Sequence, residues 1–236
     1  MSPGHLVGFD LDDTLYPERA YARSGLLHVG RQLATRYGIP TIPDRLIEEL
    51  QAGRRGDIFD AVLTECGLPP DLVPGLVEQY RSHAPDIALY PDVSPVLDAL
   101  SSRAHLVLIT DGPLVCQERK IAALGLADRF DLILCTDRWG PPYWKPHPRA
   151  FTLAAEHFEV AGRGAAYVAN DPRKDFRAPR ELGWRTIRVD RSDALNPVSA
   201  GESIVDADVS FPDLLGVTAH LLGEVANRDG AEAPEG

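Results

Sequence analysis

Cysteine and histidine are too sparse and too scattered in this 236-residue chain to form a sulfur- or nitrogen-ligated site. The three cysteines, Cys66, Cys116 and Cys135, are widely spaced and form no Cys-x-x-Cys pair, so neither a disulfide framework nor a zinc knuckle is predicted. The seven histidines include no HxH or HExxH pair. Any metal that the protein binds should therefore be held by oxygen atoms.

Long hydrophobic runs are also absent, and basic residues are fewer than acidic residues. No stretch approaches the roughly 18 apolar residues of a membrane span, and the first residues lack the basic flank and apolar region of a secretion signal. We therefore expect a cytoplasmic protein that does not enter a membrane. The chain has 24 Lys and Arg against 35 Asp and Glu, so binding to nucleic acid, which relies on clustered basic side chains, is not expected. A small metabolite is the expected partner, and no oligomeric state is predicted.

Short apolar runs alternate with longer helical patterns, which is typical of a parallel sheet with helical crossovers. Five strands are predicted, at residues 5–9, 104–109, 130–135, 165–169 and 186–189. Helices are predicted at residues 91–102, 115–124, 148–158, 173–182 and 213–226, with Gly125 and Gly183 as C-caps. The expected fold class is α/β, with a doubly wound parallel sheet.

The interval between the first two predicted strands is far longer than one crossover needs. It contains helical patterns at residues 21–37, 43–50, 57–66 and 70–82, separated by Gly and Pro, with Gly38 as a C-cap. Because the interval contains no convincing strand, we interpret it as a small helical bundle over the sheet. Residues 229–236 are small and acidic, and we expect this tail to be disordered.

Carboxylates follow two of the predicted strands. Asp10, Asp12 and Asp13 come at the end of the first strand, and Asp171 and Asp175 follow the fourth. A lone Asp-x-Asp is most simply explained by strand termination and helix capping, but the ends of neighbouring parallel strands are only about 5 Å apart. Five like charges converging there would repel and raise one another's pKa, so a bound cation is the natural resolution. An all-oxygen site with few protein ligands suits Mg2+.

Two other strand ends supply groups that complement a phosphate. The second strand runs into Thr110, Asp111 and Gly112, where a hydroxyl and loop amides could receive phosphate oxygens. The third strand leads through a loop to Lys145, a cation among the acids. A single Thr or Lys is more often a turn residue or a solvated charge, so only the combination is informative.

The chain carries DxDxT, TDG, KP and NDxxxD in that order, each after a predicted strand. This combination resembles the haloacid dehalogenase superfamily of phosphohydrolases, and the match spans residues 6–211. The resemblance implies a Rossmann-like catalytic core at residues 1–16 and 89–228. It also implies a helical cap at residues 17–88, as in the subgroup whose cap lies between motifs one and two.

The resemblance implies roles for the first two acids. Asp10 would be the nucleophile that becomes an aspartyl phosphate, with one of its oxygens on Mg2+. Asp12 would be the general acid and base, with its backbone carbonyl on the metal. Neighbouring acids that raise the pKa of Asp12 would suit this double use. The dehalogenases that name the superfamily do not keep this second aspartate, which argues against carbon–halogen chemistry. Asp13 stands where glycine is frequent in the family.

The remaining motif residues have implied roles around the phosphate and the metal. Thr110 and the amide of Asp111 would bind phosphate, and Lys145 would hold both the phosphate and Asp10. Asp171 would be a metal ligand, and Asp175 would support the metal directly or through water. A cation such as Lys145 is needed because a carboxylate is a poor nucleophile toward a phosphate dianion.

The expected function is that of a Mg2+-dependent phosphatase for a small phosphomonoester, such as a sugar phosphate, a nucleotide or a phospho-acid. A phosphomutase of the same superfamily and a non-catalytic phosphate-binding protein are the alternatives. Substrate selectivity is expected in the cap, where Arg54 and Arg55 are candidates to bind a polar end of the substrate. Solvated charges at a helix end are the alternative interpretation of these two arginines.

Overall fold

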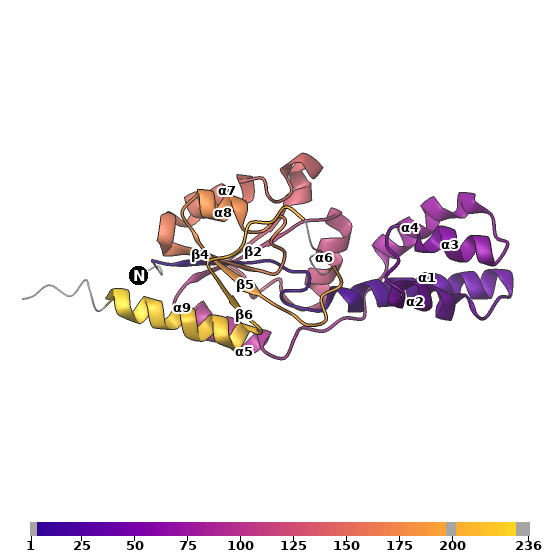
Figure 1. Ribbon diagram of the computed structural model, residues 1–236, viewed down its shortest axis with the longest axis horizontal. Coiled ribbons are helices and arrows are strands. Elements are labelled where there is room, and N and C mark those ends of the chain that lie inside the picture. The colour runs from indigo at the N-terminus through magenta and orange to yellow at the C-terminus, as the bar shows by residue number, and fades with distance from the viewer. Residues whose placement is uncertain (1–3, 197–201, 230–236) are drawn as a thin grey trace, which may run out of the picture.

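The computed structural model describes residues 4–196 and 202–229, which form a six-stranded sheet with helices on both faces and a helical insertion (Figure 1). All neighbouring strands are parallel, in the order β3 (Leu132–Cys135), β2 (His105–Thr110), β1 (Leu6–Phe9), β4 (Ala165–Ala169), β5 (Arg185–Val189) and β6 (Val209–Phe211). The predicted doubly wound α/β fold is confirmed. Strand order runs outward from β1 and β4 in opposite directions, so these two strands flank the switch point at which such folds bind ligands.

The central strands are buried on both faces, which explains their continuous apolar sequences. In β1, a Cβ atom on Gly8 would lie 2.9 Å from Cδ2 of Tyr167 on the neighbouring strand, so a larger residue would displace that ring. The sixth strand corrects the prediction of five. It has only three residues, none of them fully buried, and a segment this short carries no recognisable pattern.

Each face of the sheet is covered by its own apolar cluster. Figure 1 shows α7 (Arg149–Phe158) and α8 (Arg177–Glu181) on one face, and α5 (Val93–Ser101) and α9 (Leu214–Asp229) on the other. The helix α6 (Leu114–Ala123) packs beside β3. The described residues also form four short 3-10 helices: η1 (Pro70–Leu72), η2 (Thr136–Trp139), η3 (Pro141–Tyr143) and η4 (Gly162–Gly164). The helix α8 is shorter than the predicted 173–182, because residues 173–176 form a turn closed by Asp175, whose carboxylate accepts the Asp171 N–H at 2.9 Å.

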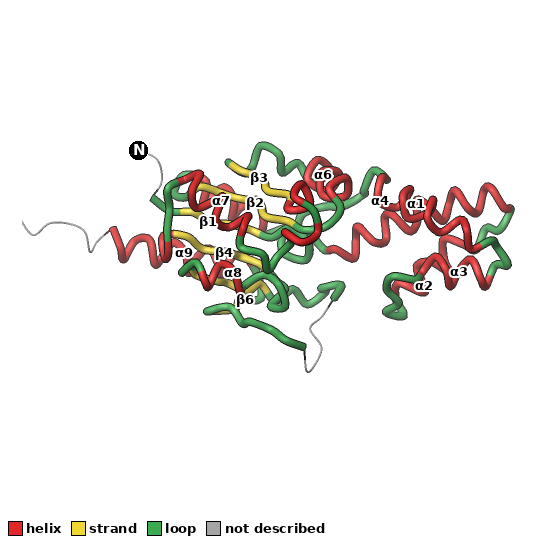
Figure 2. Tube along the Cα trace, turned by 90° about the horizontal axis from the view of Figure 1, so that it is seen from above, coloured by secondary structure: helices red, strands yellow, loops and turns green. Residues whose placement is uncertain are grey.

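Four helices form the insertion between β1 and β2, as predicted: α1 (Glu18–Tyr37), α2 (Ile42–Gln51), α3 (Ile58–Glu65) and α4 (Val73–Ser82). They pack around a third apolar cluster that is distinct from the two clusters on the sheet. Figures 1 and 2 both place these helices beyond one end of the sheet. One buried member of their cluster, Leu195, comes from the loop after β5.

The ends of the chain add two observations. The last helix continues to Asp229, three residues beyond its predicted end, and residues 230–236 of the predicted tail lie outside the described residues. In the part of the chain that the structure describes, no helix has the length and apolar character needed to span a bilayer.

Candidate active site

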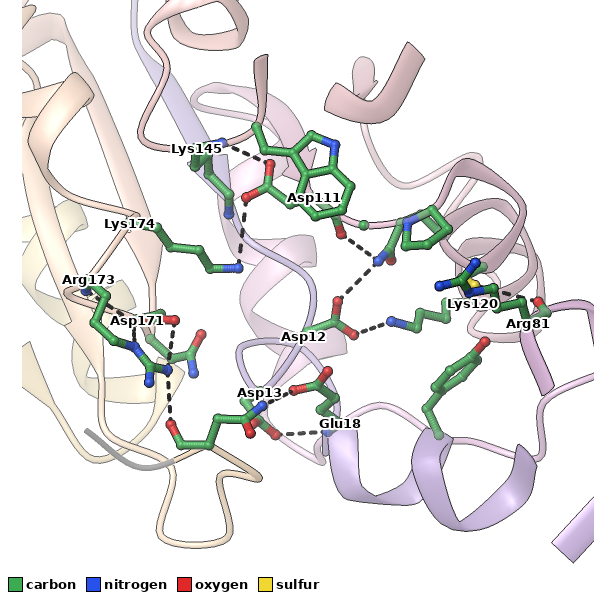
Figure 3. Close-up of a pocket in the computed structure, with 18 of the residues that line it drawn as sticks. Asp12, Asp13, Glu18, Arg81, Asp111, Lys120, Lys145, Asp171, Arg173 and Lys174 are labelled. Atoms are coloured by element: carbon green, nitrogen blue, oxygen red, sulfur yellow. Dashed lines mark hydrogen bonds and ion pairs between the residues drawn. The ribbon is translucent and has the colours of Figure 1, made fainter. Parts of the chain in front are cut away.

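Several predicted motif residues line a cavity of about 480 Å³ at the carboxyl ends of the strands (Figure 3), whereas Asp10, Thr110 and Asp175 are buried and are not part of its wall. Asp10 follows β1 directly and its N–H donates to the Val168 carbonyl of β4 at 2.9 Å. Its neighbour Asp12 lines the cavity, as do Asp111 after β2, Lys145 after β3 and Asp171 after β4. The volume is that of a small-molecule site.

Lys145 is buried between two carboxylates. Its Nζ lies 2.5 Å from Asp10 Oδ1 and 2.7 Å from Asp175 Oδ1, and it donates to the Tyr167 hydroxyl at 3.0 Å. The contact with Asp175 is an ion pair without regular hydrogen-bond geometry. The three hydrogens of the ammonium group therefore have three oxygen neighbours. Tyr167 is a part of this arrangement that the motifs do not predict, and its only sequence signal is a hydroxyl in an otherwise apolar strand.

The Asp10–Lys145 pair has unusual proton affinities. Burial raises the pKa of Asp10 to about 7, against the attraction of Lys145. Burial alone would lower the pKa of Lys145, but Asp10 and Asp175 hold it well above its usual value. Lys145 is therefore a permanent cation, and any further positive charge placed beside Asp10 will favour its ionised, nucleophilic form.

Asp12 is held by two side chains of α6 and by Tyr16, which lies between β1 and α1. The Nζ of Lys120 lies 2.7 Å from Oδ1, the Nε2 of Gln117 donates to Oδ2 at 3.3 Å, and the Tyr16 hydroxyl donates to Oδ1. Burial would raise the pKa of Asp12, but the charge and hydrogen bond of Lys120 outweigh it and the pKa is lowered. This corrects the expectation that neighbouring acids raise it. Lys120 and Gln117 were not predicted, although their spacing of three on one helix places them on the same face.

Asp111 connects the loops that follow β2 and β3. Its Oδ1 accepts the Thr136 hydroxyl at 2.7 Å and the Lys145 N–H at 3.1 Å. Thr110 is fully buried, and its hydroxyl has no hydrogen-bond partner among the described residues. A side chain on Gly112, whose φ is +110°, would place its Cβ 2.7 Å from Gln117, so this turn requires glycine.

The carboxylates that were predicted to bind a metal already have partners within the protein. Within residues 4–196 and 202–229, no three His, Cys, Asp or Glu side chains are grouped to hold a metal ion. The carboxylate of Asp171 is occupied by Arg173, with Nε 2.7 Å from Oδ1 and NH2 2.9 Å from Oδ2. Burial would raise the pKa of Asp171, but these hydrogen bonds lower it. The acids are therefore not all unpaired, because Lys145, Lys120 and Arg173 form ion pairs with four of them. The expected repulsion is still present, since the charges of Asp175 and Asp12 raise the pKa of Asp10.

Asp13 also differs from expectation. It adopts a left-handed conformation, with φ 53°, which explains why it can replace a glycine of the family pattern. Its carboxylate accepts the N–H groups of Glu18 at 2.8 Å and Leu195 at 2.7 Å. Asp13 is thus a structural acceptor that joins the start of α1 to the loop after β5.

The oxygen atoms of these side chains are nevertheless of the chemical type that binds a divalent cation. Asp10 and Asp171 bring carboxylate oxygens from the ends of adjacent strands, and Asn170, which precedes Asp171, adds an amide side chain to the cavity wall. Among the residues that the structure describes, the second oxygen of Asp10, Oδ2, has only a long 3.4 Å contact with the Thr14 hydroxyl, so it can accept a ligand. Hard oxygen donors of this kind suit Mg2+. For Asp171 to take part, Arg173 must release its carboxylate.

The structure does not place Arg54 and Arg55 at the cavity. Arg54 is at the surface, with its Nε 2.5 Å from Glu49 and its NH1 2.9 Å from Asp57. Arg55 donates to the backbone carbonyls of Leu50, Arg54 and Leu195. The predicted role in substrate binding is therefore corrected: one arginine is a surface ion pair and the other is a structural link.

Comparisons with known proteins agree with this architecture. Residues 5–183 match a family model described as haloacid dehalogenase-like hydrolase. The chain is 35% identical over 138 residues to a phosphoserine phosphatase of Thermus thermophilus, covering 58% of this chain and 55% of that protein, so the match spans about half of that relative. It is 31% identical over 197 residues to a glyceraldehyde 3-phosphate phosphatase of Methanopyrus kandleri, covering 78% and 83%. Among solved structures, the hydrolase YfnB of Bacillus subtilis shares the fold with a TM-score of 0.67 at 18% identity, covering 92% and 98%.

Proposed function

Because the chain belongs to the haloacid dehalogenase-like hydrolase family, we propose that it is a Mg2+-dependent phosphatase acting on a small phosphomonoester through an aspartyl phosphate at Asp10. Relatives named phosphoserine phosphatase, glyceraldehyde 3-phosphate phosphatase and phosphoglycolate phosphatase support the reaction type. The observation that carries the proposal is the buried Asp10–Lys145 pair at 2.5 Å, with Asp12 two residues further on. A nucleophile and an acid–base group would then lie at the end of β1, beside a neutralising cation from the loop after β3.

In the first half of the proposed reaction, a carboxylate oxygen of Asp10 attacks phosphorus and the bond to the leaving oxygen breaks. Lys145 reduces the repulsion between the carboxylate and the phosphoryl oxygens. The leaving alkoxide takes a proton from Asp12. Lys120 lowers the pKa of that acid, and a phosphoryl dianion bound nearby raises it again, because like charges favour the protonated form.

In the second half, water attacks the phosphorus of the aspartyl phosphate, Asp12 accepts the proton, and inorganic phosphate leaves with Asp10 regenerated. The low pKa of Asp12 favours this step, because the free carboxylate is then the prevailing form. The buried hydroxyl of Thr110 and the amide of Asp111 are the proposed phosphate donors. The unpartnered state of that hydroxyl among the described residues supports the assignment.

Mg2+ would be held by Asp10, the backbone carbonyl of Asp12 and Asp171, with Asp175 supporting it directly or through water. It would neutralise charge on the phosphoryl group. We also propose that residues 17–88 act as a cap over the core at residues 1–16 and 89–228. The support is that α1 and α4 supply Tyr21 and Arg81 to the wall of the cavity.

The test is release of inorganic phosphate from p-nitrophenyl phosphate and from a panel of phosphorylated metabolites, with and without Mg2+ after treatment with EDTA. Asp10→Asn keeps the shape of the side chain but removes the attacking charge, so turnover should fall by about 10³-fold or more. Asp98→Asn is the matched control, because Asp98 is exposed on α5 and pairs only with Arg129. An Asp10→Asn variant with a tenth of wild-type turnover, or wild-type turnover that does not depend on Mg2+, would contradict the proposal. Isomerisation without phosphate release would favour the phosphomutase alternative.

A further inference from the structure

The cavity has a second end that takes no part in the proposed chemistry apart from Lys120, which holds Asp12. Figure 3 shows Lys145 and Lys174 at one end, whereas Lys120 and Arg81 lie at the other. The second end is formed by α1, α4 and α6, and its walls include Tyr21, Tyr80, Arg81 and Cys116. A phosphoryl group bound near Lys145 would direct its leaving group toward this end, where a substrate can be distinguished from others that share the same phosphate.

Arg81 differs from every other cation of this cavity. Lys120 pairs with Asp12, Lys145 with Asp10 and Asp175, Arg173 with Asp171, and Lys174 lies 3.8 Å from Asp111. Within the described parts of the chain, the guanidinium of Arg81 has no hydrogen-bond or ion-pair partner. An unpaired cation that faces a cavity is available to an anionic ligand, whereas the paired cations are already neutralised by the protein.

The end of α4 that carries Arg81 is anchored. The backbone carbonyl of Arg81 accepts the Cys116 thiol of α6 at 3.5 Å. Two residues further on, His83 is buried, and its Nε2 lies 3.1 Å from the Ser24 hydroxyl of α1. The Tyr80 ring packs edge-on against Tyr21, with ring centroids 5.6 Å apart. The backbone of Arg81 is therefore fixed on three sides while its side chain is free.

We propose that Arg81 binds a carboxylate on the leaving group, so that the preferred substrate is a small phosphomonoester carrying a carboxylate; this rests on the proposed phosphatase function. A guanidinium presents paired N–H donors that match a carboxylate in a bidentate geometry. A second phosphate is disfavoured relative to a carboxylate, because Asp13 and Glu18 place acidic side chains in the cavity wall and repel a dianion more strongly than a single negative charge. The Tyr21 and Tyr80 rings provide apolar surface for a short carbon skeleton.

The test compares substrate pairs that differ at this group. 3-Phosphoglycerate is compared with glycerol 3-phosphate, and O-phosphoserine with O-phosphoethanolamine, by kcat/KM in the presence of Mg2+. Wild-type protein should prefer the carboxylate member of at least one pair. Arg81→Met should lower that preference ratio by about tenfold, because only the carboxylate member loses a contact, and Arg81→Lys should lower it less. Arg54→Met is the matched control and should leave the ratio unchanged, because Arg54 lies outside the cavity.

The outcomes separate this inference from the function on which it rests. If wild-type protein hydrolyses p-nitrophenyl phosphate but prefers neither carboxylate member, the role of Arg81 is overturned and the phosphatase proposal stands. An unchanged ratio in Arg81→Met overturns it in the same way, and a preference for a bisphosphate would assign Arg81 to a second phosphate instead. If no substrate in the panel releases phosphate, both proposals fail together.

Discussion

Lys120 and Gln117 hold the carboxylate of Asp12 from α6, although Lys120 lies 108 residues away in sequence. Lys120 is itself buried, and its Nζ lies 4.4 Å from the centre of the Tyr21 ring. Asp12, the proposed acid–base group, thus has a fixed direction as well as a lowered pKa. Orientation matters for proton transfer, because a general acid must reach the leaving oxygen within hydrogen-bond distance.

Replacing Lys120 should therefore slow substrates whose leaving group must be protonated more than substrates whose leaving group departs without a proton. In Lys120→Met we expect turnover of an alkyl phosphate to fall roughly tenfold further than turnover of p-nitrophenyl phosphate, whose nitrophenolate leaves without protonation. The measurement is kcat for both substrates, and Lys120→Arg, which keeps the charge, should show a smaller difference. Equal losses on the two substrates would instead indicate a general structural role for Lys120.

At the residue scale, sequence order predicted the four motifs but not their partners. The strand ends predicted that Lys145 lies among the acids, and the family resemblance implied its contact with Asp10, which the structure shows at 2.5 Å. The ion pairs of Arg173 and Lys120 could not be predicted, because they depend on the direction of individual side chains in a turn and on a helix face. Arg54 and Arg55 were misassigned for the same reason: the pattern identifies the helical insertion, but not which of its cations face the cavity.

At the scale of elements, a single ion pair joins three segments of the core. Arg191, after β5, donates to both oxygens of Asp92, with NH1–Oδ2 2.8 Å and NH2–Oδ1 3.0 Å. Asp92 precedes α5, and its Oδ2 also accepts the N–H of Leu214, the first residue of α9, at 2.8 Å. Both side chains are largely buried, with exposures of 7% and 11%. Burial would raise the pKa of Asp92, but the hydrogen bonds from Arg191 and Leu214 lower it.

This pair should stabilise the fold in a pH-dependent way. Because the pKa of Asp92 is lower in the folded than in the unfolded state, its contribution is complete above the ordinary value of 3.8 and is lost as pH falls through the folded value. Arg191→Met should lower the free energy of unfolding at pH 7 by about 2 kcal/mol. Denaturant titrations should show this difference shrinking as pH falls below the ordinary carboxyl range.

A surface ion pair provides the comparison for Arg191. Arg129 and Asp98 approach to 2.7 Å but are 31% and 73% exposed, so Arg129→Met should change the free energy of unfolding by less than about 1 kcal/mol. A difference between Arg191→Met and wild type that persists unchanged at low pH would mean that lost packing, rather than the charge of Asp92, accounts for the effect.

The elements that sequence patterns predicted well are those with a long, regular burial pattern. Helix α5 shows this in Val93, Val96, Leu97 and Leu100, which are buried at helical spacing. β6 was missed because its three edge residues, none of them fully buried, have no such pattern. α8 was overextended because the turn before it is set by a hydrogen bond from the Asp171 N–H to the Asp175 carboxylate. Tertiary contacts, rather than local propensity, decide such boundaries.

At the scale of the whole molecule, the helical insertion is attached to the core through Leu195 as well as through the chain itself. Leu195 is 7% exposed within the apolar cluster of the inserted helices, although it belongs to the loop after β5. Its N–H donates to Asp13 at 2.7 Å, and its carbonyl accepts Arg55 NH2 at 3.2 Å. One residue of the loop after β5 thus connects the acidic turn after β1 with the inserted helices.

Truncating Leu195 should therefore loosen the insertion without unfolding the sheet. In Leu195→Ala we expect a loss of about 2 to 3 kcal/mol in local stability, because a buried leucine is replaced by a partly filled void. Hydrogen–deuterium exchange should become faster in α2 and α3, while β1, β2 and β4 remain as protected as in wild type. Leu215→Ala is the matched control, because Leu215 is 57% exposed on α9 and its loss should leave exchange in the inserted helices unchanged. Faster exchange in the central strands as well would contradict a local link, because it would mean that Leu195 supports the whole fold rather than the attachment of the insertion.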